Sequence, residues 1–108
     1  MRVAWGRVEP GKWDEYEAAY RKGAGEAGTP DGMVAHRLMR DIDDPDTGYT
    51  TLVFESREAM EAYENSTNKA TRLAPIQPFF PAAFVVNRLE VVIDETFDET
   101  VVRATEDA

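Results

Sequence analysis

The sequence predicts a single α+β domain in which a four-stranded antiparallel sheet carries two helices on one face. Three observations lead to this prediction. Four segments have the composition and the two-residue period of strands. Two other segments have the helical period of about 3.6 residues, and turn residues separate these six segments from one another. The resulting order is strand–helix–strand–strand–helix–strand, a split β-α-β arrangement whose right-handed crossovers place both helices on the same side of the sheet.

The first strand is predicted over residues 2–8 and is followed by a helix that starts at Lys12. In the strand, one face would carry Val3, Trp5 and Arg7, and the other Arg2, Ala4, Gly6 and Val8. We expect Trp5 to point into the layer between sheet and helices. In the helix, Trp13, Tyr16 and Tyr20 recur at the spacing of one buried face. The glycines at positions 23, 25 and 28 weaken the helix and end it before Thr29.

A hairpin and a second helix come next. Residues 33–42 and 49–55 are predicted to be paired strands, because the polar loop at 43–48 between them has nothing to bury. Ser56 is a good N-cap for a helix over residues 57–65, in which Ala59, Met60 and Tyr63 form the buried stripe. A shorter helical piece is expected to follow through Leu73.

The remaining chain is predicted to form an apolar loop and a long strand. Three prolines in residues 75–81 exclude both helix and central strand, so we expect an ordered apolar loop there. Residues 82–93 read as one strand, longer than the usual length of about five or six residues. The sheet face opposite the helices would carry large side chains, and an apolar face of that size needs a cover. A homodimer that pairs two such faces is therefore expected.

Composition and charge limit the function classes. The 108 residues carry a net charge of −9, which disfavours nucleic acid and anionic membranes as partners. We expect a domain over residues 1–93 and an acidic tail over 94–108, either flexible or exchanged with a partner. There are no cysteines, which excludes disulfides and thiolate chemistry. With no signal peptide or membrane span visible, a cytoplasmic location is expected.

Three segments resemble the antibiotic biosynthesis monooxygenase-like domains, which have the ferredoxin-like dimeric α+β barrel fold. They are VEPG at residues 8–11, PDGM at 30–33 and FESREAMEAY at 54–63, the last being similar to the family's joint between a strand and an amphipathic helix. The resemblance covers about residues 2–93. It implies a dimer whose pocket lies between helices and sheet.

Members of this family include haem-degrading oxygenases, quinol oxygenases and monooxygenases that oxidise phenolic polyketides without metal or flavin. In the haem-degrading members an Asn, a Trp and a His form the site; Trp5, Tyr63 and Arg72 stand at those positions here. A guanidinium has no lone pair to offer iron, so haem degradation is disfavoured. We therefore expect neither a metal nor another cofactor.

Two residues are candidates for catalysis. His36 is the only histidine and titrates nearest neutrality, so it is a candidate base; the alternative is a structural histidine in the core or at the dimer face. The resemblance places Arg72 at a site position, where it would hold a phenolate or carboxylate; the alternative is an ordinary exposed arginine at a helix end.

Five residues are candidates for substrate binding: Trp5, Tyr20, Tyr63, Asn68 and Asn87. The aromatic residues would form the walls of the pocket, although such stripes also serve as plain core. The asparagines would orient a substrate oxygen; the alternative for Asn68 is that it caps or breaks the helix. The predicted function is cofactor-independent oxygenation of a small aromatic, polyketide-like or quinol-type substrate. The alternative is a non-catalytic binder or a cyclase-like protein on the same barrel.

Overall fold

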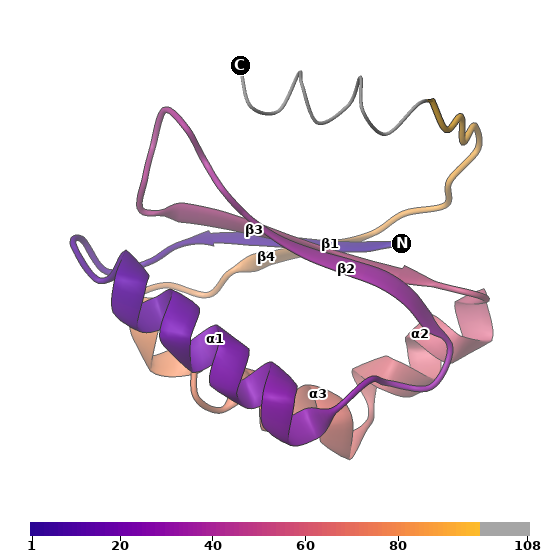
Figure 1. Cartoon of the computed structure of the whole chain (residues 1–108), viewed down its shortest axis with the longest axis horizontal. Helices are drawn as coiled ribbons and strands as arrows, with labels where there is room; N and C mark the ends of the chain where they lie inside the picture. The colour runs from indigo at the N-terminus through magenta and orange to yellow at the C-terminus, as the bar shows by residue number, and fades with distance from the viewer. Residues whose placement is uncertain (98–108) are drawn as a thin grey trace.

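The computed structural model describes residues 1–97 and shows one antiparallel sheet with all its helices on one side (Figure 1). The strands are β1 (Arg2–Arg7), β2 (Met33–Arg40), β3 (Thr47–Phe54) and β4 (Val85–Arg88), in the sheet order β2-β3-β1-β4. The helices are α1 (Trp13–Ala27), α2 (Arg57–Glu64) and α3 (Thr67–Leu73), followed by a 3-10 turn, η1 (Gln77–Phe79). The predicted ferredoxin-like α+β fold is confirmed.

The helix boundaries follow from local capping. The Ser56 hydroxyl accepts a hydrogen bond from the Ala59 amide at 3.1 Å, which confirms Ser56 as the N-cap of α2. Ser66 caps α3 in the same way through the amide of Lys69. Helix α1 ends at Gly28, whose φ of 71° is a conformation that glycine adopts without a steric penalty. Helices α1 and α3 approach closely at Gly23, where an added Cβ would lie 2.9 Å from the Arg72 carbonyl oxygen.

The prediction of one long strand over residues 82–93 is wrong. Strand β4 is confined to Val85–Arg88, and it pairs only with β1. The last contact of this ladder is the bond that the Leu89 amide donates to the Met1 carbonyl at 2.7 Å. Within the described residues, the chain after Leu89 has no strand partner, so the strand ends at Arg88. The predicted tail of residues 94–108 lies mostly outside the described residues.

The proline-rich segment is ordered, but it is not purely a loop. Pro78 sits in the first turn of η1, a position that does not need the amide hydrogen that proline lacks. Ile76 is buried in the main core cluster with Val8, Trp13 and Tyr16, and Phe79 and Phe80 pack against Tyr16 with ring centroids 6.2 and 5.4 Å apart. The Phe79 carbonyl accepts a bond from the Glu9 amide at 2.8 Å. This segment therefore closes one end of the space between sheet and helices.

The two faces of the sheet differ in what covers them. Ala4 and Arg2 of β1 are buried beneath the helices, and they lie opposite Thr50 and Leu52 of β3. On the other face Trp5 is 41 % exposed and stacks on Tyr49 at a centroid distance of 6.2 Å. The strand registers place the following residues on this second face, which we call the open face: Val3, Trp5, Arg7, Ala35, Arg37, Met39, Thr47, Tyr49, Thr51, Val53, Val85 and Asn87. Within the described residues, no helix is long and apolar enough to cross a membrane.

Candidate functional site

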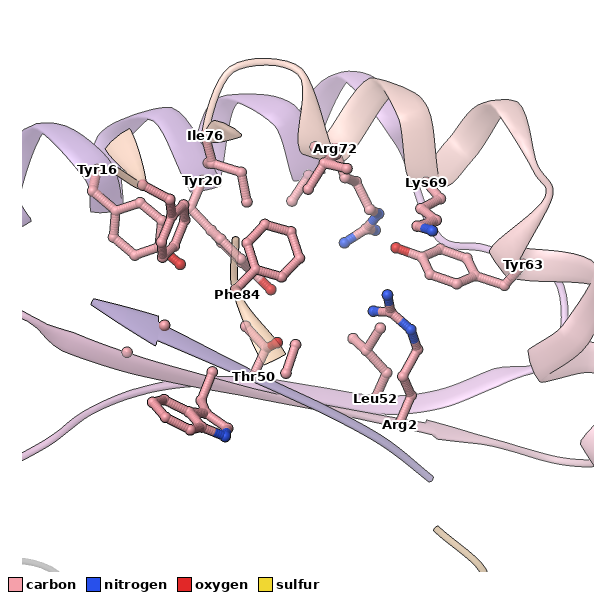
Figure 2. A pocket seen from close by; sticks show the side chains of 17 residues that line it. Arg2, Tyr16, Tyr20, Thr50, Leu52, Tyr63, Lys69, Arg72, Ile76 and Phe84 are labelled. Carbon is pink, nitrogen blue, oxygen red and sulfur yellow. The ribbon is translucent and has the colours of Figure 1, made fainter. Parts of the chain in front are cut away.

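A pocket lies between the helix-covered face of the sheet and helices α1, α2 and α3 (Figure 2). Its cavity volume is about 70 Å³. Strands β1 and β3 form its floor, the helices form its roof, and the segment that leads into β4 closes one side. The lining residues are Arg2, Ala4, Trp5, Gly6, Tyr16, Tyr20, Ala24, Gly48, Thr50, Leu52, Tyr63, Lys69, Arg72, Leu73, Ile76, Phe80 and Phe84.

One end of the pocket is aromatic. The rings of Tyr16 and Tyr20 on α1 pack edge to face, with their centroids 6.2 Å apart. Ile76 and Phe84 complete the walls of this end (Figure 2). The backbone of β1 lies unusually close to this wall at Gly6, where an added Cβ would be 2.8 Å from Cβ of Phe84. Flat apolar rings of this kind provide a surface on which a planar ring can stack.

The other end is cationic. The side chains of Arg2, Lys69 and Arg72 point toward one another and toward the Tyr63 hydroxyl (Figure 2). They come from β1 and α3, so the fold brings together residues that lie far apart in the sequence. No carboxylate is among the lining residues, and none of these three cations forms an ion pair with a described residue. A strongly positive site thus lies inside a chain whose net charge is −9.

Hydrogen bonds orient two of these cations. The Arg72 Nε donates to Oδ1 of Asn68 at 2.8 Å, and its terminal nitrogen donates to the Gly28 carbonyl at 2.6 Å. Asn68 in turn donates to the Ala27 carbonyl at 3.0 Å, which ties α3 to the end of α1. The Lys69 ammonium donates to the Glu64 carbonyl at 3.4 Å. Arg2 differs: it is only 8 % exposed, and its buried Nε has no hydrogen-bond partner.

Burial raises the pKa of two phenols that line the pocket, so both stay protonated well above neutral pH. It raises the pKa of Tyr20 to about 12, although Arg72 acts in the opposite direction. Burial also raises the pKa of Tyr63, against the opposing charges of Arg72 and Arg2. Both hydroxyls are therefore protonated at neutral pH and can donate hydrogen bonds. Burial, helped by the charge of Arg72, lowers the pKa of His36, so the imidazole is neutral at pH 7.

Four of the predicted site residues come together here. Arg72, Tyr20 and Tyr63 line the pocket, and Asn68 holds the Arg72 guanidinium in place. His36 lies beside the pocket rather than in its lining: its imidazole stacks on the Tyr20 ring at 5.8 Å with an interplanar angle of 12°.

Two predicted residues point elsewhere. The expectation that Trp5 faces the helices is wrong: its strand position borders the pocket, but the alternation along β1 and the stacking on Tyr49 place the indole on the open face. Asn87 lies opposite Val3 and shares that face. The physical reason is that Phe80 and Phe84 pack against β1 at Gly6, where an added Cβ has no room, so Gly6 faces the helices and its neighbour Trp5 points to the other face.

Arg2 and Lys69 were not predicted as site residues. Arg2 occupies the same strand face as Ala4 and Gly6, and an arginine among such small residues is the signal that marks it. Lys69 lies three residues before Arg72 on α3, a spacing that puts both on one helix face. Among residues 1–97, no three side chains of His, Cys, Asp or Glu gather as a metal site would require.

The structure is a ferredoxin-like α+β fold with a pocket between its helices and its sheet. The family model described as antibiotic biosynthesis monooxygenase matches residues 2–70, which is more than half of the chain. The chain therefore belongs to the antibiotic biosynthesis monooxygenase family.

Solved structures have the same fold. A protein of Nitrosomonas europaea assigned to the antibiotic biosynthesis monooxygenases is 12% identical and superposes with a TM-score of 0.72, covering 85% of this chain and 97% of its own. Rv0793 of Mycobacterium tuberculosis is 15% identical, with a TM-score of 0.72 and coverages of 88% and 96%. A similarly assigned protein of Bordetella bronchiseptica is 18% identical, with a TM-score of 0.73 and coverages of 85% and 95%. At these identities the similarity establishes the fold alone. No curated protein matches the chain.

Proposed function

We propose that this protein is a cofactor-independent monooxygenase that acts on a small, electron-rich phenol or quinol bound between the helices and the sheet. The observation that carries the proposal is the two-ended pocket, aromatic at Tyr16 and Tyr20 and cationic at Arg2, Lys69 and Arg72. The family membership supports the reaction class. The resemblance noted for the sequence supports an oxygenation in which the substrate itself supplies the electrons.

The pocket suits the charges of such a reaction. A quinol that loses a proton becomes electron-rich enough to pass electrons to dioxygen, and the three cations favour that ionised form. For a hydroquinone, insertion of one oxygen atom yields a hydroxyquinone, and the second oxygen atom leaves as water. All four electrons come from the substrate, so the balance needs no other reductant. The neutral Tyr63 hydroxyl supplies a hydrogen-bond donor, and the apolar walls exclude water.

The cavity favours a single ring. Its volume of about 70 Å³ is roughly half of the ~150 Å³ known for an apolar cavity that binds benzene. A monocyclic quinol would therefore need modest movement of the lining side chains, whereas a fused polyketide would require the helices to move apart. We accordingly place single-ring quinols first among the substrates.

Oxygen consumption tests this function. Full-length protein freed of metal by chelation is expected to consume one dioxygen per molecule of hydroquinone, faster than buffer alone, and to form no hydrogen peroxide. Added catalase should consequently return no oxygen, which distinguishes oxygenation from simple oxidation to the quinone. A panel of hydroquinones and anthrones without any protein-dependent uptake would contradict the proposal.

A non-catalytic binder is the second candidate, and one observation favours it. No histidine or carboxylate is among the lining residues, so the pocket itself lacks a conventional base. The neutral His36 lies behind the Tyr20 ring. Saturable binding of hydroquinone with no oxygen uptake would establish this alternative.

We also propose that two copies of the chain pair through their open faces. Trp5, Met39 and Val85 are each at least two-fifths exposed on this face, although they are large and apolar. Such a patch on a small domain favours association. The family to which the chain belongs is consistent with a dimer.

The Trp5→Glu variant tests the dimer. Light scattering of the native chain at micromolar concentration is expected to give twice the chain mass of 12.1 kDa. The Trp5→Glu variant is expected to give the mass of one chain, because pairing would bury the new carboxylate in the interface without a partner. Ala18→Glu adds the same charge on the exposed side of α1 and should leave the dimer intact. A native mass near that of one chain would refute the pairing.

A further inference from the structure

We infer that the substrate is an aromatic acid whose carboxylate binds at Arg2, Lys69 and Arg72 while its ring extends toward Tyr16 and Tyr20. This inference rests on the proposed function, because it names the substrate class of the same pocket. Three cations converge at one end of the cavity, and no lining residue carries a negative charge to balance them.

Arg2 is the residue that calls for an anion. Its side chain is more than nine-tenths buried, its guanidinium points into the pocket, and its Nε has no hydrogen-bond partner among the described residues. A buried guanidinium without a partner is costly, so such residues are normally paired with an anion. The acid Glu64 is not a lining residue; its Oε2 lies 3.9 Å from Arg88, the cross-strand neighbour of Arg2, and its buried Oε1 likewise has no hydrogen-bond partner among the described residues.

The geometry of the donors favours a carboxylate. A guanidinium presents a planar fork that matches the two oxygens of a carboxylate. Arg72 is already oriented by Asn68 and by the Gly28 carbonyl, so it is preorganised for such a contact. Lys69 and the protonated Tyr63 hydroxyl add two donors at the same end. A single phenolate oxygen would leave most of this capacity unused.

The aromatic end fixes the rest of the ligand. Ile76, Phe84 and the two tyrosines line the part of the cavity away from the cations (Figure 2). An anion without a ring would leave these walls without a partner, and a ring without an anion would leave Arg2 unpaired. The occupant that satisfies both ends is a benzoate-like molecule. For an oxygenase, its reactive form would be a 2,5-dihydroxybenzoate, which is a hydroquinone whose carboxylate lies next to one hydroxyl, so that the same cations also favour the ionised hydroxyl.

Binding of unreactive probes tests the inference independently of turnover. By isothermal titration, the full chain is expected to bind benzoate at least about tenfold more tightly than benzamide, which has the same shape and no charge. Acetate, which has the charge without the ring, should also bind at least about tenfold more weakly. Arg2→Met should weaken benzoate binding about tenfold and change benzamide binding by less than about twofold. Arg57→Met, which removes an exposed arginine of α2, should change neither.

The outcomes separate this inference from the proposed function. Equal affinity for benzoate and benzamide, or an Arg2→Met variant with native affinity for benzoate, would overturn the carboxylate site even if hydroquinone is oxygenated. Equal binding of acetate and benzoate would overturn the aromatic part. A preference for benzoate without any oxygenation would support the anion site and contradict the enzyme. If Arg2→Met does not fold, Lys69→Met serves instead, with an expected loss for benzoate of about fivefold.

Discussion

Replacing Trp13 with alanine is expected to lower the free energy of unfolding by about 3–5 kcal/mol. Trp13 is only 5 % exposed and belongs to the main core cluster. Its ring meets Tyr16 edge to face at 5.1 Å, and the guanidinium of Arg40 lies 4.9 Å from the ring centroid. The ring also packs on the backbone at Gly48, where an added Cβ would lie 3.0 Å away. Alanine would therefore leave a cavity that the rigid sheet cannot fill.

Thermal and urea unfolding at a fixed protein concentration would measure this loss. A loss of this size should lower the melting temperature by about 15–30 °C. It is a large fraction of the total stability of about 5–15 kcal/mol that is typical of a folded domain. Trp13→Phe should cost less, because the ring contacts are partly kept. Phe97→Ala is the matched control: Phe97 is 68 % exposed, and its loss should change stability by less than about 0.5 kcal/mol. A Trp13→Ala variant as stable as this control would contradict the core described here.

Replacing Arg72 with methionine is expected to lower kcat/KM for a quinol about 100-fold. Among the three pocket cations, Arg72 forms the most hydrogen bonds, to Asn68 and to the Gly28 carbonyl. Its positive charge also acts to lower the pKa values of Tyr20, Tyr63 and His36. Loss of one preorganised donor at developing negative charge typically costs about 10²–10³ in rate. Steady-state oxygen uptake would measure the effect.

Two further variants separate the charge of Arg72 from its placement. Arg72→Lys keeps the charge but loses the fork that binds Asn68 and Gly28, so an intermediate loss of about tenfold is expected. Asn68→Ala keeps the guanidinium but removes its orienting partner, and a similar loss should follow. Circular dichroism would verify that each variant is folded, since the same contacts tie α3 to α1. Native kcat/KM in Arg72→Met would show that this cation does not act on the substrate.

Local signals in the sequence were sufficient for the order of the elements. The change from a period of two to one of 3.6, the turn residues and the Ser56 cap are all short-range features, and each is found in the structure. The length of β4 is set instead by its pairing with β1, which is a long-range property. Leu89 and the apolar run at 91–93 therefore read as strand, although among the described residues β4 ends at Arg88 and pairs only with β1.

Part of the candidate site was predictable, where its residues lie close in sequence or match the family. Tyr63 and Arg72 line the pocket, whereas Asn68 is not among the lining residues and instead orients the Arg72 guanidinium. Which face of β1 meets the helices was not predictable from polarity, because both faces carry a large or charged side chain. The structure resolves this by placing Arg2 in the pocket and Trp5 on the open face.

Isotope labelling tests the central claim of cofactor-free oxygenation most directly. Metal-free protein would be mixed with hydroquinone under ¹⁸O₂, and the mass of the product would be read promptly, with unlabelled dioxygen in ¹⁸O-water as the control for exchange. We expect a hydroxyquinone with one ¹⁸O atom, formed by the native chain and largely lost in Arg72→Met. An unlabelled quinone, or a labelled product formed equally fast without the protein, would contradict it.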